Sequence, residues 1–339
     1  MKTVLFAYSK NGMKTAAKIR ECFPDADVSC FVTERIAGND FLPLGKPSRD
    51  FYGERFRTAD VLIFIGSCGI AVREIAPHVR SKLTDPAVIC VDELGKYVIP
   101  ILSGHIGGAN RMAKTIAGHL DALAVITTAT DINQRFAADQ WAAENGMIID
   151  NAETAKKVSA AILERDIPIS SDLPVTSAFP NGTFNGSSGD IGIYIGWEEK
   201  LPFQTTLRLI PLVLHLGIGC RKGICPETVS NAIRVFLSQN RIDPRAIATA
   251  ESIDIKRDEK GLLEALRELG IPIRFYSAED LLKTEGVFQH SDFVQNVTGV
   301  DNVCERAAML GADKLIVPKT IMNGVTLALA AERKELCFE

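Results

Sequence analysis

The chain has 339 residues, 46% hydrophobic and 24% charged, with a formal net charge of −4 at pH 7. Its length suggests two or more globular domains, and its acidic balance does not favour nucleic acid as a partner. The longest apolar stretch, Leu207–Ile218, is interrupted by Arg208, Pro211 and His215 and is shorter than the roughly 20 residues of a membrane span. Because the first residues also lack the pattern of a signal peptide, we expect a cytoplasmic protein.

Short β-rich runs alternate with amphipathic segments through the first part of the chain. This alternation, with several strands continuously apolar, predicts a sheet covered by helices on both faces. The expected strands are Thr3–Tyr8, Asp27–Val32, Val61–Ile65, Ala87–Val91, Tyr97–Leu102 and Ala124–Thr127. The expected helices are Met13–Cys22, Glu74–Leu83 and Gly108–Leu120.

Residues 137–208 have a less regular pattern. Ala137–Glu164 has a helical pattern, and Ile191–Ile195 has the pattern of a strand. Between them, Pro168–Gly189 is rich in Ser, Pro, Asn and Gly, which are turn signals. We interpret this region either as an appendage of the first domain or as a small domain of its own.

A second α/β pattern fills the rest of the chain. Strands are expected at 209–216, 246–250, 272–276, 314–317 and 325–330, with helices at 227–238, 260–269 and 303–310. The predicted fold class is therefore α/β in two layered domains. The N-terminal domain covers 1–136, the middle region 137–208, and a smaller C-terminal α/β domain 209–339.

The loop Leu102–Asn110 concentrates reactive groups between an apolar strand and an amphipathic helix. His105 has an ordinary pKa of about 6.5, which suits proton transfer near neutrality. Amides of Gly107 and Gly108 could stabilise an oxyanion, and Ser103 and Asn110 add polar side chains. We predict that His105 is a general base; the alternative is a helix cap in which His105 is only hydrogen-bonded.

Two further loops follow apolar strands. Gly66 and Arg73 bracket a glycine-containing turn that could bind an anion at a helix start, or simply join a strand to a helix. Asp92 and Glu93 could serve as general base or as groups that orient His105, but carboxylates are equally common in turns.

A polar run closes the first domain. Thr127, Thr130 and Asp131 offer hydroxyls and a carboxylate at the end of a strand, where ligands gather in open α/β sheets. The alternative is a helix N-cap.

In the C-terminal domain, Cys220 and Arg221 lie in a glycine-rich turn that lacks the P-loop spacing. Lys256 and Glu305 lie in charged segments further along the chain. None of the eight cysteines forms a Cys-x-x-Cys pair, so we expect reduced thiols and no metal or cofactor bound by the protein itself.

Taken in order, these motifs resemble the CbiG family over nearly the whole chain, least across 137–205. The N-terminal motifs are Gly66–Arg73, Lys82-x-x-Asp85-Pro-Ala-Val, Val91-Asp-Glu-x-Gly95, Leu102–Asn110 and Thr127–Asp131. The C-terminal motifs are Gly217–Arg221, Ser252–Glu259 and Gly299–Glu305 followed by Ala307-Ala308, with Arg306 as a departure. This C-terminal half also resembles the stand-alone CobE protein.

The resemblance implies a cobalt-precorrin-5A hydrolase of anaerobic cobalamin (vitamin B12) biosynthesis. Such an enzyme opens the ring-A δ-lactone of its tetrapyrrole substrate and releases acetaldehyde, giving cobalt-precorrin-5B, with the cobalt belonging to the substrate. Individual residue roles are our own predictions. We assign catalysis to His105, Asp92 and Glu93. The predicted substrate-binding residues are Gly66, Arg73, Ser103, Gly107, Gly108, Asn110, Thr127, Thr130, Asp131, Cys220, Arg221, Lys256 and Glu305.

Other functions stay open on the sequence alone. The chain could be a non-catalytic carrier of the tetrapyrrole, or an unrelated flavin or nucleotide enzyme. A homodimer and transient hand-over of the product to other cobalamin-pathway enzymes are also open, whereas neither a membrane nor nucleic acid is expected as a partner.

Overall fold

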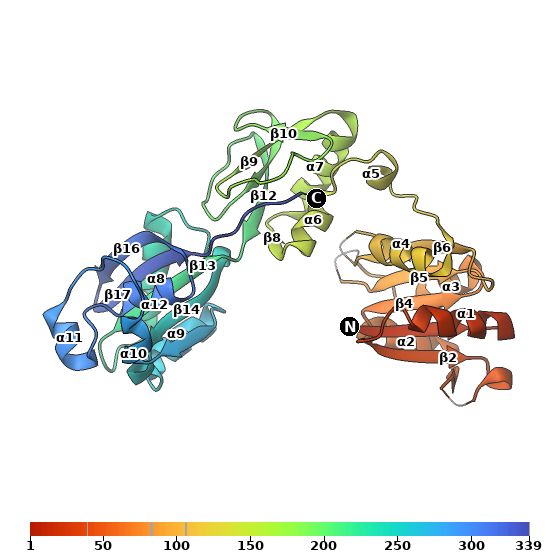
Figure 1. Cartoon of the computed structure of the whole chain (residues 1–339), viewed down its shortest axis with the longest axis horizontal. Coiled ribbons are helices and arrows are strands. Elements are labelled where there is room, and N and C mark those ends of the chain that lie inside the picture. Colours follow the sequence, from red (N-terminus) through yellow and green to blue (C-terminus); the bar gives the residue numbers. More distant parts are fainter. Residues whose placement is uncertain (39, 82–83, 106, 339) are drawn as a thin grey trace. The chain divides into compact units, whose positions relative to one another are not determined.

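The computed structural model describes residues 1–38, 40–81, 84–105 and 107–338 (Figure 1). It divides into two compact units, Met1–Gln140 and Trp141–Glu339. Among the described residues, the first unit contains a seven-stranded sheet and the second contains two five-stranded sheets. The α/β fold class is therefore confirmed. Most of the middle region belongs to the second unit and is not an appendage of the first.

The first unit alternates strands and helices along the chain. Its elements are β1 (Lys2–Ala7), α1 (Lys10–Arg20), β2 (Asp27–Val32), a 3-10 turn (Glu34–Ile36), β3 (Leu42–Pro43), α2 (Ser48–Thr58), β4 (Val61–Ile65), α3 (Cys68–Ile75), β5 (Ala87–Val91), β6 (Tyr97–Leu102), α4 (Ala109–Leu120), β7 (Leu123–Ala124) and α5 (Ala129–Ile132). Helix α6 (Ala138–Glu144) crosses the boundary between the units.

Helices cover both faces of this sheet. Successive residues of β4 point to opposite faces of the sheet, so neighbours such as Ile63 and Phe64 belong to different apolar clusters. One cluster includes residues of α1 and α4, and the other residues of α2 and α3. Because every residue of β4 and β5 is buried, both strands read as continuous apolar runs in the sequence.

Strand direction fixes where the loops of this sheet emerge. The order is β3-β2-β1-β4-β5-β6-β7, with β1, β2, β4 and β5 parallel. Strand β6 runs antiparallel to β5, with Leu102 opposite Val88, and β7 is parallel to β6. The loops after β6 and β7 therefore emerge where β5 begins, which we call the β6 edge. Loops after β1, β4 and β5 emerge at the opposite edge, the β5 edge.

Several expected elements of the first unit differ in the structure. The helix expected at Glu74–Leu83 is α3, which begins at Cys68 and ends at Ile75. Its expected end, with Lys82 and Leu83, lies outside the described residues. The strand expected at Ala124–Thr127 is only Leu123–Ala124, and α2 was not expected at all.

The second unit begins with a mixed sheet ordered β10-β9-β11-β12-β8. Its elements are β8 (Met147–Ile149), α7 (Ala152–Glu164), β9 (Ile167–Ser171), β10 (Thr183–Asn185), β11 (Ile191–Ile195) and β12 (Thr205–Pro211). The helical pattern expected at Ala137–Glu164, with aspartates and asparagines between its parts, is only partly helical. It is divided into α6, β8 and α7, with Gly146 at a φ of +63° between α6 and β8.

The C-terminal sheet has the order β15-β14-β13-β17-β16. Its elements are β13 (Leu214–Cys220), α8 (Pro226–Gln239), a 3-10 turn (Pro244–Ala246), β14 (Ile247–Ile253), a second 3-10 turn (Asp254–Lys256), α9 (Lys260–Glu268), β15 (Ile273–Tyr276), α10 (Ala278–Leu282), α11 (Asp292–Thr298), α12 (Cys304–Leu310), β16 (Lys314–Met322) and β17 (Val325–Ala331). The strand expected at 209–216 is really the end of β12 and the start of β13, separated at residues 212–213.

Helix α12 packs against β13 at a glycine. A Cβ on Gly217 would lie 1.7 Å from the carbonyl oxygen of Cys304 and 2.9 Å from the Cβ of Ala308. Only glycine permits this approach, since the nearest obstacle is backbone rather than a movable side chain.

We expect Gly217→Ala to destabilise the second unit by about 3 kcal/mol or more, because the added methyl group forces strand and helix apart. Urea unfolding of the full chain measures this effect. As a matched control, Gly118→Ala lies in α4 with nothing within 4 Å of the new Cβ, and should be neutral or stabilising. An unchanged unfolding midpoint for Gly217→Ala would contradict the packing described.

Candidate functional site

At the β6 edge, His105 lies between two carboxylates. Its Nε2 is 3.5 Å from Asp131 Oδ2 and 3.1 Å from Thr130 Oγ1, and its Nδ1 is 3.5 Å from Asp139 Oδ1. The side chains of His105, Asp131 and Asp139 are 18%, 18% and 10% exposed. We call these four residues the His105 cluster. An imidazole held by carboxylates at both nitrogens has a fixed ring orientation and a strong bias toward holding a proton.

The electrostatics of the cluster follow from this geometry. Interaction with Asp139 raises the pKa of His105 above its ordinary value, and Asp131 acts in the same direction. Partial burial opposes both carboxylates but does not outweigh them. The imidazole is therefore a stronger base than a free histidine.

A polar network continues from Asp131 to helix α4. Asn110 Nδ2 donates to Thr128 Oγ1 at 2.8 Å and to Asp131 Oδ2 at 2.9 Å, and Lys114 Nζ donates to Asp131 Oδ1 at 2.9 Å. Asn110 is only 2% exposed. Thr130 and Asp131 thus contact His105, and Asn110 joins the network through Asp131, so residues of two separate sequence motifs come together.

The glycine-rich loop shapes the backbone around His105. Ser103 has a φ of +56°, and its hydroxyl donates to the carbonyl of Asp85 at 2.9 Å. The amide of Gly108 donates to the carbonyl of His105 at 2.9 Å, so it is not available to an oxyanion. A Cβ on Gly107 would lie 2.4 Å from that of Ser103. Ser103, Gly107 and Gly108 therefore have structural roles here, and the predicted use of the Gly108 amide is wrong. Ile106, in the same loop, lies outside the described residues.

Asp92 and Glu93 lie at the other edge of the sheet. They follow β5, whereas His105 follows β6, and four paired residues of β5 separate the two edges by roughly 10 Å. Asp92 accepts hydrogen bonds from the amides of Lys96 and Tyr97 at 2.6 Å each, which closes the turn between β5 and β6. Glu93 accepts from Ser9 Oγ at 2.6 Å. The predicted role of these carboxylates as partners of His105 is therefore wrong.

Gly66 and Arg73 also lie away from the His105 cluster. Gly66 directly follows β4 at the β5 edge. Arg73 is in the last turn of α3, and its Nε donates to the carbonyl of Gly69 at 3.1 Å. Because α3 begins at Cys68, Arg73 does not lie at the helix start, and its predicted binding of a carboxylate stays a prediction. Thr127 is exposed and precedes Thr128, whose hydroxyl accepts a hydrogen bond from Asn110.

A second candidate site lies in the C-terminal sheet of the second unit. A pocket of about 500 Å³ opens where β13 and β14 end, and Cys220, Arg221 and Lys256 all line it. Three residues predicted from two separate motifs thus share one pocket. Burial raises the pKa of the Cys220 thiol, although Lys256 acts in the opposite direction. A thiol with a raised pKa is less reactive as a nucleophile.

Glu305 does not face this pocket. Its side chain is 1% exposed, and it accepts hydrogen bonds from the amides of Lys319 at 2.7 Å and Gln289 at 2.9 Å, and from Asn302 Nδ2 at 2.5 Å. It positions the pocket's walls, which differs from the predicted direct contact with substrate. Lys319 was not among the predicted binding residues but lines the pocket.

His215 is buried. Its Nδ1 is 3.0 Å from Glu251 Oε1 and its Nε2 is 2.8 Å from Glu332 Oε1. Burial lowers the pKa of His215, but the two carboxylates outweigh it and the net shift is upward. The group lies at the start of β13, while the pocket is at its end.

Comparison with known proteins connects both sites to one family. A cobalamin synthesis G N-terminal model matches residues 50–131, and a cobalamin synthesis G C-terminus model matches residues 214–330. A protein of Salmonella typhimurium named cobalt-precorrin-5A hydrolase is 31% identical over 340 residues, with 96% of each chain covered. The chain belongs to the cobalamin synthesis G family. A Priestia megaterium protein of the same name is 30% identical, covering 96% of this chain and 93% of its own.

The cobalamin synthesis G matches contain most of the residues described above. The N-terminal match includes His105, Thr130 and Asp131 but ends before Asp139, and the C-terminal match includes the pocket residues that belong to β13 and β17. Protein CobE of Sinorhizobium sp. is 31% identical over 121 residues, which is 34% of this chain and 79% of CobE.

Within residues 1–38, 40–81, 84–105 and 107–338, no group of three His, Cys, Asp or Glu side chains is arranged to hold a metal ion. In the same described ranges, no helix combines the length and apolarity that a bilayer crossing needs.

Sequence reasoning missed three members of the first site. Thr128 lies in the motif Thr127–Asp131, and Lys114 lies in the helix expected at Gly108–Leu120. Their separation in the sequence did not indicate that either contacts the other residues of the site. Asp139 is an acid in the first turn of α6, which in sequence looks like any residue that complements a helix dipole.

We expect Asp139→Asn to lower the pKa of His105, because it removes the negative charge that contributes most to the upward shift. Titration of the His105 imidazole by NMR measures this directly. Asp92→Asn is the matched control and should leave the His105 pKa unchanged, since Asp92 lies at the opposite edge of the sheet. An equal His105 pKa in Asp139→Asn and wild-type protein would show that Asp139 does not interact with His105.

Proposed function

We propose that this chain is a cobalt-precorrin-5A hydrolase of cobalamin biosynthesis, and that it opens the ring-A δ-lactone with release of acetaldehyde to give cobalt-precorrin-5B. The observation that carries the proposal is the His105 cluster, a basic imidazole held by Asp131 and Asp139. Full-length similarity to relatives that are named for this reaction supports it.

In this mechanism His105 is the general base. The imidazole takes a proton from water as the water oxygen bonds to the lactone carbonyl carbon. The lactone acyl carbon–oxygen bond then breaks. The alkoxide released collapses to the carbonyl of acetaldehyde as the bond from its carbon to the macrocycle breaks, and the macrocycle carbon keeps that electron pair and takes up a proton. Asp139 at Nδ1 orients the ring and stabilises the imidazolium that forms. The proton is taken up at Nε2, beside Thr130 and Asp131.

Charge that develops on the lactone oxygen needs a donor other than the Gly108 amide. Lys114 supplies the positive charge nearest to Asp131 in the hydrogen-bonded network, and its side chain is 60% exposed. We assign it the stabilisation of the oxyanion. The protein then needs no cofactor of its own, and the cobalt is part of the substrate.

A non-catalytic carrier is the second candidate function, and the C-terminal pocket favours it. The described residues that line the pocket are mainly apolar side chains and cations, and none of them is a histidine. A carrier would bind the tetrapyrrole there, pass it to a later cobalamin-pathway enzyme and release no acetaldehyde. The hydrolase would also hand its product to such an enzyme.

We expect His105→Ala to slow acetaldehyde release from cobalt-precorrin-5A by about 100-fold or more, the usual contribution of a general base. The assay traps acetaldehyde under strict anaerobiosis. His119→Ala is the matched control, because His119 lies on the outer side of α4 about 3.7 Å from Glu21, and it should keep wild-type turnover.

Two outcomes would overturn the assignment. Near-normal turnover of His105→Ala would show that another group is the base. Tetrapyrrole binding by the wild-type chain with no acetaldehyde at all would favour the carrier.

A further inference from the structure

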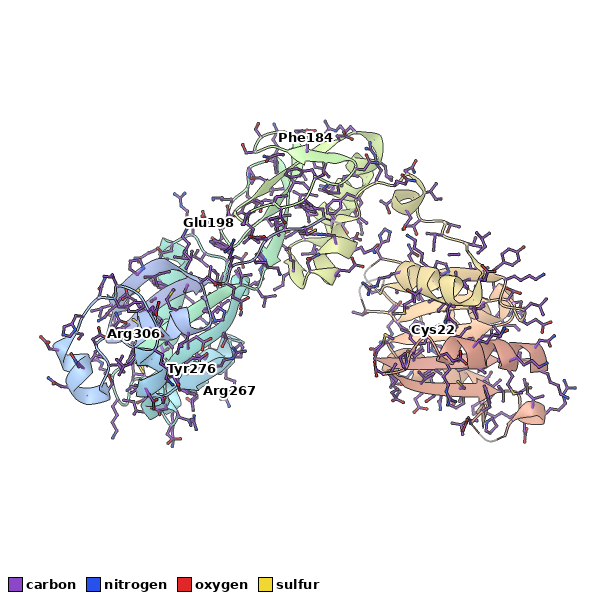
Figure 2. All side chains as sticks on the ribbon, viewed as in Figure 1. Cys22, Phe184, Glu198, Arg267, Tyr276 and Arg306 are labelled. Atoms are coloured by element: carbon purple, nitrogen blue, oxygen red, sulfur yellow. The ribbon has the colours of Figure 1, made fainter. Side chains whose placement is uncertain are left out.

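A buried hydrogen bond joins the loop that contains His105 to the segment before β5. The hydroxyl of Ser103 donates to the carbonyl of Asp85 at 2.9 Å, and both residues are 8% exposed. Ser103 directly follows β6, and Asp85 lies two residues before β5. The two strands lie side by side in Figure 1, and Figure 2 shows the side chains of the same unit. This bond therefore lies at the β6 edge, where the loop that contains His105 begins.

The backbone of Ser103 indicates why its hydroxyl matters. With a φ of +56°, Ser103 has the left-handed conformation that glycine adopts most readily. The loop has glycine at 104, 107 and 108 but serine here. A residue other than glycine in this conformation is strained, and such strain persists only where surrounding contacts hold it. The bond to Asp85 is such a contact, and a glycine would lose it.

The rest of the loop folds back onto Ser103. Its carbonyl accepts the amide of Ala109 at 3.1 Å, and a Cβ on Gly107 would lie 2.4 Å from the Cβ of Ser103. The His105 carbonyl accepts the Gly108 amide at 2.9 Å within the same turn. A shift of Ser103 is therefore passed to the backbone of His105.

Asp85 is itself fixed by its carboxylate. Its Oδ2 accepts the amides of Arg80 at 2.8 Å and Ser81 at 2.9 Å, and its own amide donates to the Ser81 carbonyl at 2.9 Å. Pro86 follows, and the residue before a proline is restricted to extended conformations. The carbonyl that accepts from Ser103 is therefore held in place from both sides.

The hydrolysis steps above leave Asp85 without a role, although it belongs to one of the motifs found in the sequence. We propose that Asp85 and Ser103 are positioning residues that hold His105 between Asp131 and Asp139 for proton transfer. We call their hydrogen bond, with the two amide contacts of the Asp85 carboxylate, the loop brace. Its part in catalysis rests on the proposed function, whereas its placement of the imidazole does not.

The His105 cluster has little tolerance for movement. His105 is 3.5 Å from both Asp131 and Asp139, which is already longer than an ordinary hydrogen bond. A further shift of the loop weakens both contacts and moves the base away from the reacting water. Asp85 itself does not contribute to the pKa shift of His105, which comes from Asp139 and Asp131. Its effect therefore passes through the backbone.

The first test compares Ser103→Gly with Ser9→Gly in the full chain. Glycine suits the backbone of residue 103, so Ser103→Gly removes the hydroxyl without adding strain. We expect it to lower kcat for acetaldehyde release by about tenfold, with KM little changed, because the base is misplaced while substrate contacts remain. The His105 pKa, measured by NMR titration without substrate, should fall toward its ordinary value as Asp139 and Asp131 raise it less.

Ser9→Gly is the matched control. The Ser9 hydroxyl also bridges two segments, because it accepts the Gly12 amide at 3.0 Å and donates to Glu93 at 2.6 Å. These contacts lie at the β5 edge, so Ser9→Gly should keep the wild-type kcat and the wild-type His105 pKa.

A second test uses two substitutions of Asp85. Asp85→Ala removes both amide contacts, whereas Asp85→Asn keeps an oxygen that can accept them. We expect Asp85→Ala to lower kcat and the His105 pKa as Ser103→Gly does, and Asp85→Asn to stay close to wild type. The double variant Asp85→Ala/Ser103→Gly should be no slower than the slower single variant, because the two residues act as one unit.

Three results would overturn the proposal. They are an unchanged kcat and His105 pKa in Ser103→Gly, equal losses in Asp85→Asn and Asp85→Ala, and additive losses in the double variant. If even the wild type released no acetaldehyde while the His105 pKa shifts were as expected, the hydrolase would be wrong and the loop brace would stand.

Discussion

Antiparallel pairing of β6 with β5 determines the chemistry that the first unit can perform. It brings Leu102 opposite Val88, so the loop that contains His105 emerges where β5 begins. Strand β7 is parallel to β6, and the segment with Thr128, Thr130 and Asp131 follows it to the same edge. Asp131 thereby reaches His105, and Asn110 can bind Asp131 from the first turn of α4. A parallel β6 would have put the same loop at the opposite edge, beside Asp92.

The two candidate sites differ in their physical character. The His105 cluster is polar and partly buried, with carboxylates that strengthen a base. The C-terminal pocket has an apolar wall and cations at its rim, and among its described lining residues there is no histidine and no carboxylate. A tetrapyrrole presents both kinds of surface, a reactive lactone and an apolar ring with carboxylates. One substrate can therefore use both sites for different purposes.

Much of the fold could be predicted from the sequence, because strands that are buried on both faces are apolar at every position. The runs Val61–Ile65 and Ala87–Val91 are apolar at every position, and both are strands with the expected bounds. Helix α2 was missed since its buried residues, Phe51, Tyr52 and Phe56, are interrupted by charged ones. Within 137–164 the sequence shows a helical pattern with aspartates and asparagines between its parts, and the short strand β8 follows one such break at Asn145-Gly146.

The site was harder to predict than the fold. His105 was recognised as a candidate because it lies among glycines and polar residues in the loop Leu102–Asn110. Which residues contact it, however, depends on the direction of the strands. The sequence did contain a sign of that direction: only residues 92–96 join β5 to β6, too few for the crossover that parallel strands need. Asp139 could not have been found this way, because its contact with His105 joins segments 34 positions apart through tertiary structure alone.

The pH dependence of kcat/KM for acetaldehyde release, compared between wild type and Asp139→Asn, tests the central claim most directly. If His105 is the base, activity rises with pH as the imidazole loses its proton. Because Asp139 raises the His105 pKa, the rising limb of Asp139→Asn should lie at lower pH than that of wild type, with a lower plateau. Coincident rising limbs in the two proteins, or no acetaldehyde from either, would contradict the account.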